Sequence, residues 1–342
     1  MQSSPQSTVP PVYLMFGRLT RMFLLPPHGR PQLDTPGGNL LYAAAGLSLW
    51  ESPIGLVSRV GEDYPHAWLA QFRQRGLDTR GIRILPEALD LRQFLAFTEL
   101  HSRHTDNPVA YFARRELPFP KTLFGYRDTT TQLDDRAIPS NYSLRQSDIP
   151  SDFMLATSAH FCPLDYFSHS LLPSVLRQSG FTTLTLDPGR GYMDPNFFNQ
   201  VPSIVTGLTA FLLSEEKVRA LFRGRSEDLW EMAERLASYG CNIIVIKRAL
   251  QGQLLYDAET KTRWEIPAYP SREADPTGVG DAFCGGFLAG YRRTHDPLQA
   301  VLHGNVSASL AIEGSGPFYA LDSLPGLAEA RLEVIRQSVR KI

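Results

Sequence analysis

The chain has 342 residues, of which 43% are hydrophobic and 20% charged, as in an ordinary soluble globular protein. Its 34 lysines and arginines and 35 aspartates and glutamates give a formal net charge of −1, which excludes a general attraction to nucleic acid or to an anionic membrane. The three cysteines, Cys162, Cys241 and Cys284, lie far apart and predict buried, reduced thiols in a cytoplasmic protein.

The N-terminal part of the chain predicts a loose leader and then alternating strands and helices. Residues 1–11 are polar and carry prolines, and they lack the basic and apolar segments of a signal peptide. No uncharged apolar stretch approaches the roughly 18 residues that a membrane-spanning helix needs. The pattern predicts strands at 12–17 and 54–61, helices at 40–50 and 67–76, and short edge strands with turns across 23–39.

The later part of the chain has a clearer alternation. Residues 100–150 are polar and interrupted by prolines, and we interpret them as an excursion from the core. Beyond them, we expect a helix that begins at Ser226 as its N-cap and stops at Gly240. Strands are expected at 181–187, at 241–247 and, as a hairpin, at 252–257 and 262–269. Helices between buried strands predict an α/β fold with a mostly parallel sheet covered on both faces.

The stretch "DPTGVGDAFCGGFLAG", from Asp275 to Gly290, is open to three interpretations. A dinucleotide loop needs G-x-G-x-x-G early in a βαβ unit, but Phe283 stands where the third glycine belongs. A purely structural turn explains Gly286 and Gly290, whose spacing of four allows close helix packing. A phosphate cradle explains more, because the amides of Gly278, Val279 and Gly280 would bind an anion at a helix N-terminus. Asp281 would then lie one residue beyond as a general base.

This stretch is similar to the C-terminal signature of the PfkB, or ribokinase-like, carbohydrate kinase family, which reads approximately D-T-x-G-A-G-D-x-F. Four other stretches are more weakly similar to the family and occur in the family's order along the chain: "PGGNLLYAAAGL", "IGLVSRVGED", "IVIKRALQGQLLYD" and "AVLHGNVSASLAIEGSG". The resemblance covers about residues 12–335. It implies one ribokinase-like kinase domain with a small β lid, built largely from residues 18–38 and 90–130.

The resemblance also implies roles for individual residues. Asp281 would be the catalytic base, and Gly278, Val279 and Gly280 would form the anion hole for the transferred phosphoryl group. The implied acceptor contacts are Gly37, Gly38 and Asn39, and the implied nucleotide contacts are Thr277, Asn305 and Gly252. The family uses ATP with Mg²⁺ and in some members a monovalent cation, here around Asp275 and Thr277. The magnesium ligands are left unassigned.

The chain departs from the family pattern at three places. Met22, or Arg21 on a one-residue shift, stands where the family has an aspartate that binds substrate hydroxyls, and neither accepts hydrogen bonds as a carboxylate does. The family's N-x-x-E becomes Ser214 to Lys217, where Glu215 or Glu216 is a substitute or Ser214 is simply a helix N-cap. The usual glycine after the 241–247 strand is Ala249.

We therefore predict an ATP-dependent phosphotransferase acting on a hydroxyl of a small sugar-like or nucleoside-like acceptor. The alternative is a non-catalytic nucleotide- or metabolite-binding protein on the same scaffold, and a dinucleotide-dependent dehydrogenase is a weaker third hypothesis. The expected partners are small molecules, without nucleic acid or membrane, and a homodimer is left open. The sequence does not name the acceptor.

Overall fold

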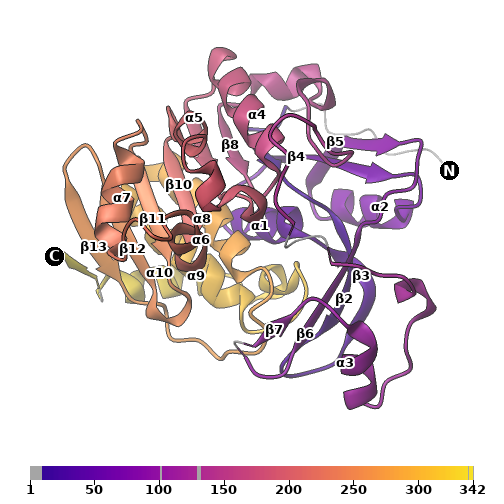
Figure 1. The fold of residues 1–342 in the computed structure, drawn as a ribbon. Helices are drawn as coiled ribbons and strands as arrows, with labels where there is room; N and C mark the ends of the chain where they lie inside the picture. Colours follow the sequence, from indigo (N-terminus) through magenta and orange to yellow (C-terminus); the bar gives the residue numbers. More distant parts are fainter. Residues whose placement is uncertain (1–9, 101, 129–131, 338, 342) are drawn as a thin grey trace.

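The computed structural model describes residues 10–100, 102–128, 132–337 and 339–341, and these form two sheets with helices around the larger one (Figure 1). Most of the predicted leader, residues 1–9, lies outside the described residues. Within these described residues, the larger sheet has ten strands. Their order across the sheet is β14 (Arg340–Lys341), β13 (Thr262–Ile266), β12 (Gln253–Asp257), β11 (Ile243–Lys247), β10 (Ala210–Ser214), β9 (Thr183–Leu186), β8 (Ser158–Phe161), β1 (Tyr13–Phe16), β4 (Ile54–Gly61) and β5 (Leu77–Leu85).

The strands from β11 across to β5 all run parallel to their neighbours, whereas β12, β13 and β14 are antiparallel additions at one edge. The predicted hairpin at 252–269 is therefore confirmed as β12 and β13. Parallel strands end at the same edge of a sheet, and ligands in open α/β sheets bind outside that carboxyl edge. The carboxyl ends of β9, β10 and β11 consequently mark where a site is expected.

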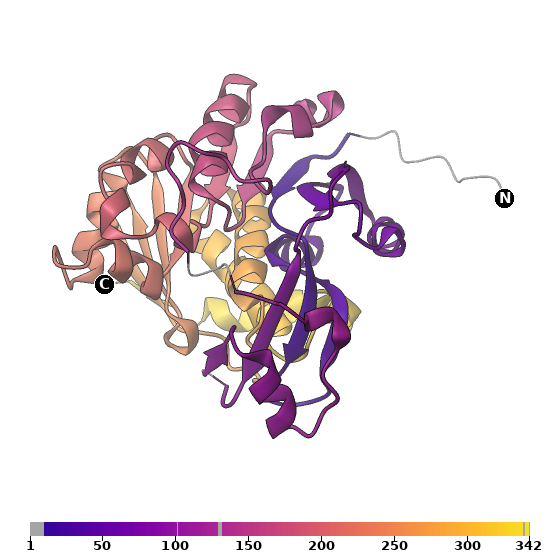
Figure 2. The same cartoon turned by 45° about the vertical axis from the view of Figure 1, so that its right-hand side comes forward.

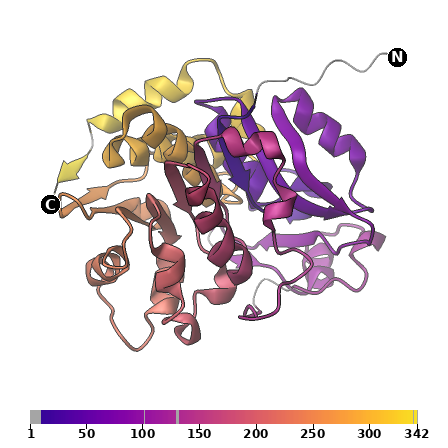
Figure 3. The ribbon, with the colours of Figure 1, turned by 90° about the horizontal axis from the view of Figure 1, so that it is seen from above.

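Helices cover both faces of the larger sheet, as the alternating pattern predicts (Figure 3). One face packs against α4 (Tyr166–Gln178), α5 (Val201–Val205), α6 (Glu215–Leu221) and α7 (Leu229–Ala237). The other packs against α1 (Asn39–Ser48), α2 (His66–Gln74), α8 (Val279–Thr294), α9 (Pro297–Ala311) and α10 (Leu327–Arg336). Successive strand residues point to opposite faces, so Leu14 and Phe16 enter one core and Tyr13 and Met15 the other.

Glycines allow α1, α8 and α9 to approach one another closely. A Cβ on Gly46 of α1 would overlap the carbonyl of Ala282, and a Cβ on Gly285 of α8 would overlap that of Ala43. On the other side of α8, a Cβ on Gly286 would meet Ser307, and one on Gly290 would lie 2.7 Å from the His303 ring. The packing role predicted for Gly286 and Gly290 is confirmed, and it fixes α8 rigidly between two helices.

The second sheet, which we call the lid, has four strands and lies along the lower side of the larger sheet (Figures 1 and 2). Its order is β3 (Gln32–Gly37), β2 (Thr20–Leu25), β6 (Arg92–Phe97) and β7 (Arg103–His104). All four strands fall within the ranges 18–38 and 90–130. The helix α3 (Pro108–Arg114) packs on its outer face, where Phe112 contacts the cluster around Phe23 and Phe94. The described residues between α3 and β8, 115–128 and 132–157, form irregular structure and short 3₁₀ turns.

One local prediction, the start of α7, differs from the structure. Asp228, not Ser226, is the N-cap of α7, because its carboxylate accepts the amides of Trp230 and Glu231. Ser226 instead donates its hydroxyl to Glu231. The helix ends at Ala237, and Gly240 follows in a left-handed conformation.

The three cysteines are buried and form no disulfide among the described residues, which confirms the expected free thiols. Across the same residues, no helix combines the length and the apolar character that a membrane crossing requires.

The turn after β11 has a residue in an unfavourable backbone conformation. Ala249 has φ 50°, in the left-handed region where a Cβ costs about 1–2 kcal/mol. We expect Ala249→Gly to raise the free energy of unfolding by about 0.5–1 kcal/mol, since relief of this cost exceeds the added chain entropy. Ala330→Gly is the matched control, because it lies exposed within α10 and should lower stability by a similar amount. Urea unfolding of both variants measures the difference, and equal destabilisation would contradict the prediction.

Candidate active site

The stretch from Asp275 forms a turn and then the first turn of α8. Gly278 is the N-cap of the helix, with φ 72°, and a Cβ at this position would overlap the ring of Tyr42. Only glycine meets both conditions without strain. Val279 is the first helical residue, and Asp281 follows in the first turn. The sequence therefore brings the predicted anion-hole residues and the predicted base together at one helix N-terminus.

The N-terminus of α8 has backbone donors available for a ligand. The amides of Asp281 and Ala282 bond to the carbonyl of Gly278, at 3.0 and 2.9 Å. By contrast, the amides of Gly278 and Gly280 donate to no protein acceptor in the part of the chain that the structure describes. Free amides and the helix dipole together favour an anion at this position.

The carboxylate of Asp281 is half-buried and has no hydrogen bond or ion pair to any other described residue. Burial and the nearby negative charge of Asp187 raise its pKa to about 7. The positive charges of Lys247, Lys217 and the lid residue Arg103 oppose this shift only in part. Asp281 thus has the pKa that a general base needs near neutral pH.

Beside Asp281 lies a buried ionic network that the sequence interpretation missed. Asp187 directly follows β9, and its two carboxylate oxygens accept hydrogen bonds from the ammonium groups of Lys217 and Lys247, each at 2.6 Å. Burial alone would raise the pKa of Asp187, but the two lysines outweigh it and lower the pKa. Lys247 also donates to the carbonyl of Gly280, at 3.2 Å, and so connects the network to the predicted anion hole.

A signal for this network exists in the sequence. Asp187 ends the predicted strand at 181–187, and Lys247 ends the predicted strand at 241–247. Because parallel strands end at one edge, these charges are expected to lie close together. Lys217 follows the third such strand, β10, by three residues. The interpretation concentrated on the glutamates of that segment and did not consider its lysine.

The glutamates of that segment are engaged elsewhere. Ser214 caps α6, with its hydroxyl accepting the amide of Lys217, as the simpler interpretation predicts. Glu215 pairs with Arg219 and Arg248, and Glu216 pairs with Arg190. Neither carboxylate is available as the family's glutamate would be.

The predicted acceptor contacts lie where β3 leads into α1. Gly38 has φ 103°, and a Cβ there would overlap the carbonyl of Arg18. The Asn39 side chain accepts the amide of Arg18 at 2.8 Å and donates to the carbonyl of Pro163 at 2.7 Å. Asn39 therefore ties the loops after β1 and β8 together, and a direct contact with an acceptor stays a prediction for all three residues.

Met22 occupies the lid position where the family has an aspartate. Its side chain is fully buried beside Gly37, and the Tyr42 hydroxyl lies 3.8 Å from its sulfur. It belongs to an apolar cluster of the lid with Leu24, Leu95 and Phe97. Arg21, the alternative position, is held by Asp34 in a two-pronged pair at 2.9 and 2.6 Å. Neither residue offers a carboxylate to an acceptor.

The predicted nucleotide contacts Gly252 and Asn305 both support the connector that leads from β13 toward α8. The Asn305 amide accepts the backbone N–H of Tyr269 and donates to Gln253 and to the carbonyl of Pro267, at 2.8 to 2.9 Å. Gly252 has φ 83° and packs beneath the same connector. The Asn305 side chain is thus occupied by structural bonds, and contact of either residue with nucleotide stays a prediction.

The start of the signature contains unpaired polar atoms. Asp275 is fully buried, and its Oδ1 accepts the amide of Thr277 at 2.9 Å. Its Oδ2 and the hydroxyl of Thr277 are buried and make no hydrogen bond of regular geometry among the described residues, although the side chains of Thr277 and Ser315 lie close enough to oppose a rise in the pKa of Asp275. Burial raises the pKa of Asp275. Buried oxygens without a partner are what a cation binding at this turn would satisfy.

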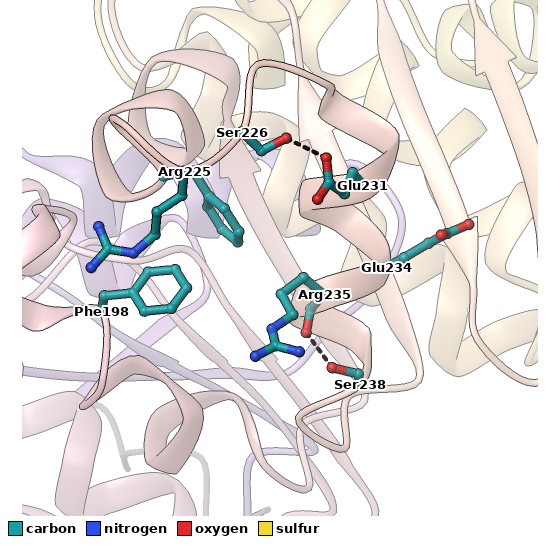
Figure 4. A pocket seen from close by; sticks show the side chains of 8 residues that line it. Phe198, Arg225, Ser226, Glu231, Glu234, Arg235 and Ser238 are labelled. Atoms are coloured by element: carbon teal, nitrogen blue, oxygen red, sulfur yellow. Dashed lines mark hydrogen bonds between the residues drawn. The ribbon is translucent and has the colours of Figure 1, made fainter.

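Two surface pockets differ in whether they are lined by residues next to the predicted site. One, of about 400 Å³, contains none of the predicted site residues and is lined by Phe198, Phe222, Arg225 and neighbouring residues of α7 (Figure 4). The other, of about 360 Å³, lies between the β2–β3 turn and residues 313–315, and includes Ala274 next to Asp275. Only the second adjoins the signature.

Comparison with known proteins places this site in a family. Residues 165–323, which include Asp187, Lys217, Lys247 and the whole signature, match the family model described as "pfkB family carbohydrate kinase". Over this range the chain is similar to the PfkB family. Among curated relatives, the cytidine kinase of Thermococcus kodakarensis is 26% identical over 82% of this chain and 88% of its own length. The 5-dehydro-2-deoxygluconokinase of Clostridium perfringens is 23% identical over 81% and 78%.

Solved structures agree with the predicted ribokinase-like fold. A putative ribokinase II from E. coli superposes with a TM-score of 0.68 at 18% identity, covering 95% of this chain and 99% of its own. The aminoimidazole riboside kinase of Salmonella enterica gives a TM-score of 0.63 at 18% identity, over 94% and 99%. These likenesses confirm the expected sheet, helices and lid.

The network around Asp187 should contribute strongly to the stability of the folded chain. Asp187→Asn removes the charge that compensates two largely buried ammonium groups, so we expect the free energy of unfolding to fall by about 3 kcal/mol or more. Glu234→Gln, which breaks the exposed pair with Arg263, is the control and should cost less than about 1 kcal/mol. Denaturant unfolding at neutral pH compares them, and similar losses for both variants would argue against the assignment.

Proposed function

We propose that this chain transfers the terminal phosphoryl group of ATP to a hydroxyl of a small sugar-like or nucleoside-like acceptor. One observation carries the proposal: the unpaired carboxylate of Asp281 stands in the same helical turn as the unused amides of Gly278 and Gly280. A base and anion donors are thereby held in one rigid unit. That combination suits attack by a hydroxyl on a phosphoryl group.

In the proposed step, Asp281 accepts the proton of the acceptor hydroxyl as that oxygen attacks the γ-phosphorus. The bond from the γ-phosphorus to the bridging oxygen breaks, and ADP leaves with the charge on its β-phosphate. The free amides at the start of α8 stabilise the charge on the transferred group. Because α8 is packed by glycines against α1 and α9, these donors need little reorganisation.

The family implies a monovalent cation and Mg²⁺, and this chain has candidate side-chain ligands for the first but not for the second. For a monovalent cation, Asp275 and Thr277 supply unpaired buried oxygens and are the residues that would hold it. For Mg²⁺, no cluster of three metal-ligating side chains exists among the described residues, and both oxygens of Asp187 are bound to lysines. The E. coli ribokinase II has been solved with ATP and Mg²⁺. Here the ion would arrive with the nucleotide phosphates.

The proposed class of acceptor is supported by the names of the relatives and by the residues of the lid. Relatives named for cytidine and for 5-dehydro-2-deoxygluconate define the two classes to test. Met22 cannot bind a hydroxyl as an aspartate would, so recognition must come from other groups around the lid. Cytoplasmic location, a homodimer and the domain limits 12–335 stay predictions.

Replacement of the base tests the proposal directly. We expect Asp281→Asn to lower kcat by about 10²- to 10⁴-fold with cytidine, other nucleosides or sugar acids as acceptors, while ATP binding persists. Because an ionised Asp281 is disfavoured by burial, the variant should be no less stable than the wild type, which excludes unfolding as the cause. Coupled ADP release and calorimetry are the measurements. ATP binding by the wild type without turnover on any acceptor would instead support the non-catalytic alternative.

The pH dependence provides an independent check on the same residue. A base works only when deprotonated, so kcat/KM should fall as the pH decreases through about 7, reaching tenfold per pH unit below it. The groups that face Asp281 and set this value are Asp187, Lys247, Lys217 and Arg103. A rate profile that is flat between pH 5.5 and 8 would exclude Asp281 as the base. The residual activity of Asp281→Asn should lack this acid limb.

A further inference from the structure

The two lysines bound to Asp187 are not equivalent. An ammonium group has three N–H donors. Lys247 uses all three, on Asp187, on the Gly280 carbonyl at 3.2 Å and on the Cys284 sulfur at 3.2 Å. Lys217 uses one, on Asp187, within the part of the chain described. Lys247 is therefore a structural link, whereas Lys217 keeps two donors for another partner.

The surroundings of Lys217 indicate what that partner is. Its side chain is only 16% exposed, so an ammonium group with unused donors is costly unless a ligand or water satisfies them. Lys217 lies in the first turn of α6, beyond the carboxyl end of β10, and thus at the edge of the sheet where ligands bind. Among the described residues, the acidic side chains that precede it in the helix pair with arginines and leave it without a second counter-ion.

A continuous chain of hydrogen bonds connects Lys217 to the anion hole. It runs from Lys217 through Asp187 and Lys247 to the carbonyl of Gly280, whose own amide is unused. Two ammonium groups and one carboxylate leave an excess positive charge in this network. The excess lies next to free amides at the positive end of the α8 dipole. Both features favour an anion with more than one charged oxygen.

We propose that Lys217 binds the terminal phosphates of the nucleotide donor and supplies a fixed positive charge to them during transfer. This inference rests on the proposed function. In the transfer step, the bond from the γ-phosphorus to the bridging oxygen breaks and the bond to the acceptor oxygen forms. The acceptor proton goes to Asp281, and Lys217 keeps its own proton throughout. Its charge meets the negative charge that grows on the β-phosphate as ADP leaves.

The test measures binding in the absence of divalent metal, so that no ion masks the lysine. Calorimetry in EDTA compares the wild type with Lys217→Met and Lys217→Arg, using ATP, inorganic pyrophosphate and AMP as probes. We expect Lys217→Met to weaken ATP and pyrophosphate binding by about tenfold or more, as for loss of a charge-assisted hydrogen bond, and AMP binding by less than about twofold. Lys217→Arg should retain part of the preference for ATP over AMP.

A matched control uses Lys261→Met, because Lys261 is exposed in the β12–β13 turn, and its affinities should equal those of the wild type. Thermal melting checks that each variant is folded. If Lys217→Met does not fold, competition of pyrophosphate with ATP on the wild type and on Lys217→Arg decides the question.

The outcomes separate this inference from the proposed function. Equal losses for ATP and AMP, no loss at all, or absence of competition by pyrophosphate would overturn the role of Lys217 while leaving the kinase proposal intact. A wild type that binds no nucleotide, with or without metal, would overturn both.

Discussion

A single buried carboxylate holds the reacting parts of this molecule in register. Asp187 lies directly after β9. It binds the ammonium group of Lys247, at the end of β11, and that of Lys217, at the start of α6. The carboxyl ends of three neighbouring strands, β9, β10 and β11, are therefore linked through this carboxylate. Through Lys247 the same carboxylate reaches the first turn of α8. Its negative charge also contributes to the raised pKa of Asp281. The position and the protonation of Asp281, the proposed base, thus depend on one side chain whose two oxygens are both bound to lysines.

The glycines of α1 and α8 supply the complementary constraint. Since helix backbones touch where Gly46 and Gly285 lie, α8 cannot slide or rotate without steric overlap. The dipole and free amides at its N-terminus are therefore aimed by packing, while the ionic network tunes the charge in front of them. Close packing of the helices fixes the orientation of residues 278–281, and the buried salt bridges set the charge around them.

How far the sequence predicts this arrangement depends on the range of the interactions. The helix start at Gly278, the packing glycines and the hairpin at 252–269 follow from local patterns, and the structure agrees with them. The N-cap of α7 was predicted two residues too early, at Ser226, whereas the carboxylate of Asp228 accepts the amides of Trp230 and Glu231. The Asp187 network was missed because its members are separated by 30 and 60 residues in the chain and meet only through the strand order. Asn305 looked available in the sequence, but its tertiary bonds occupy it.

The construction of the lid has a consequence for how the chain folds. Strand β2 leaves the core after β1, whereas its parallel partner β6 leaves after β5, so the unit α1–β4–α2–β5 lies between them in the sequence. Parallel pairing of such distant segments carries a large loop-closure entropy until the intervening elements are in place. We therefore expect β2 and β6 to pair only after α1, β4, α2 and β5 have folded.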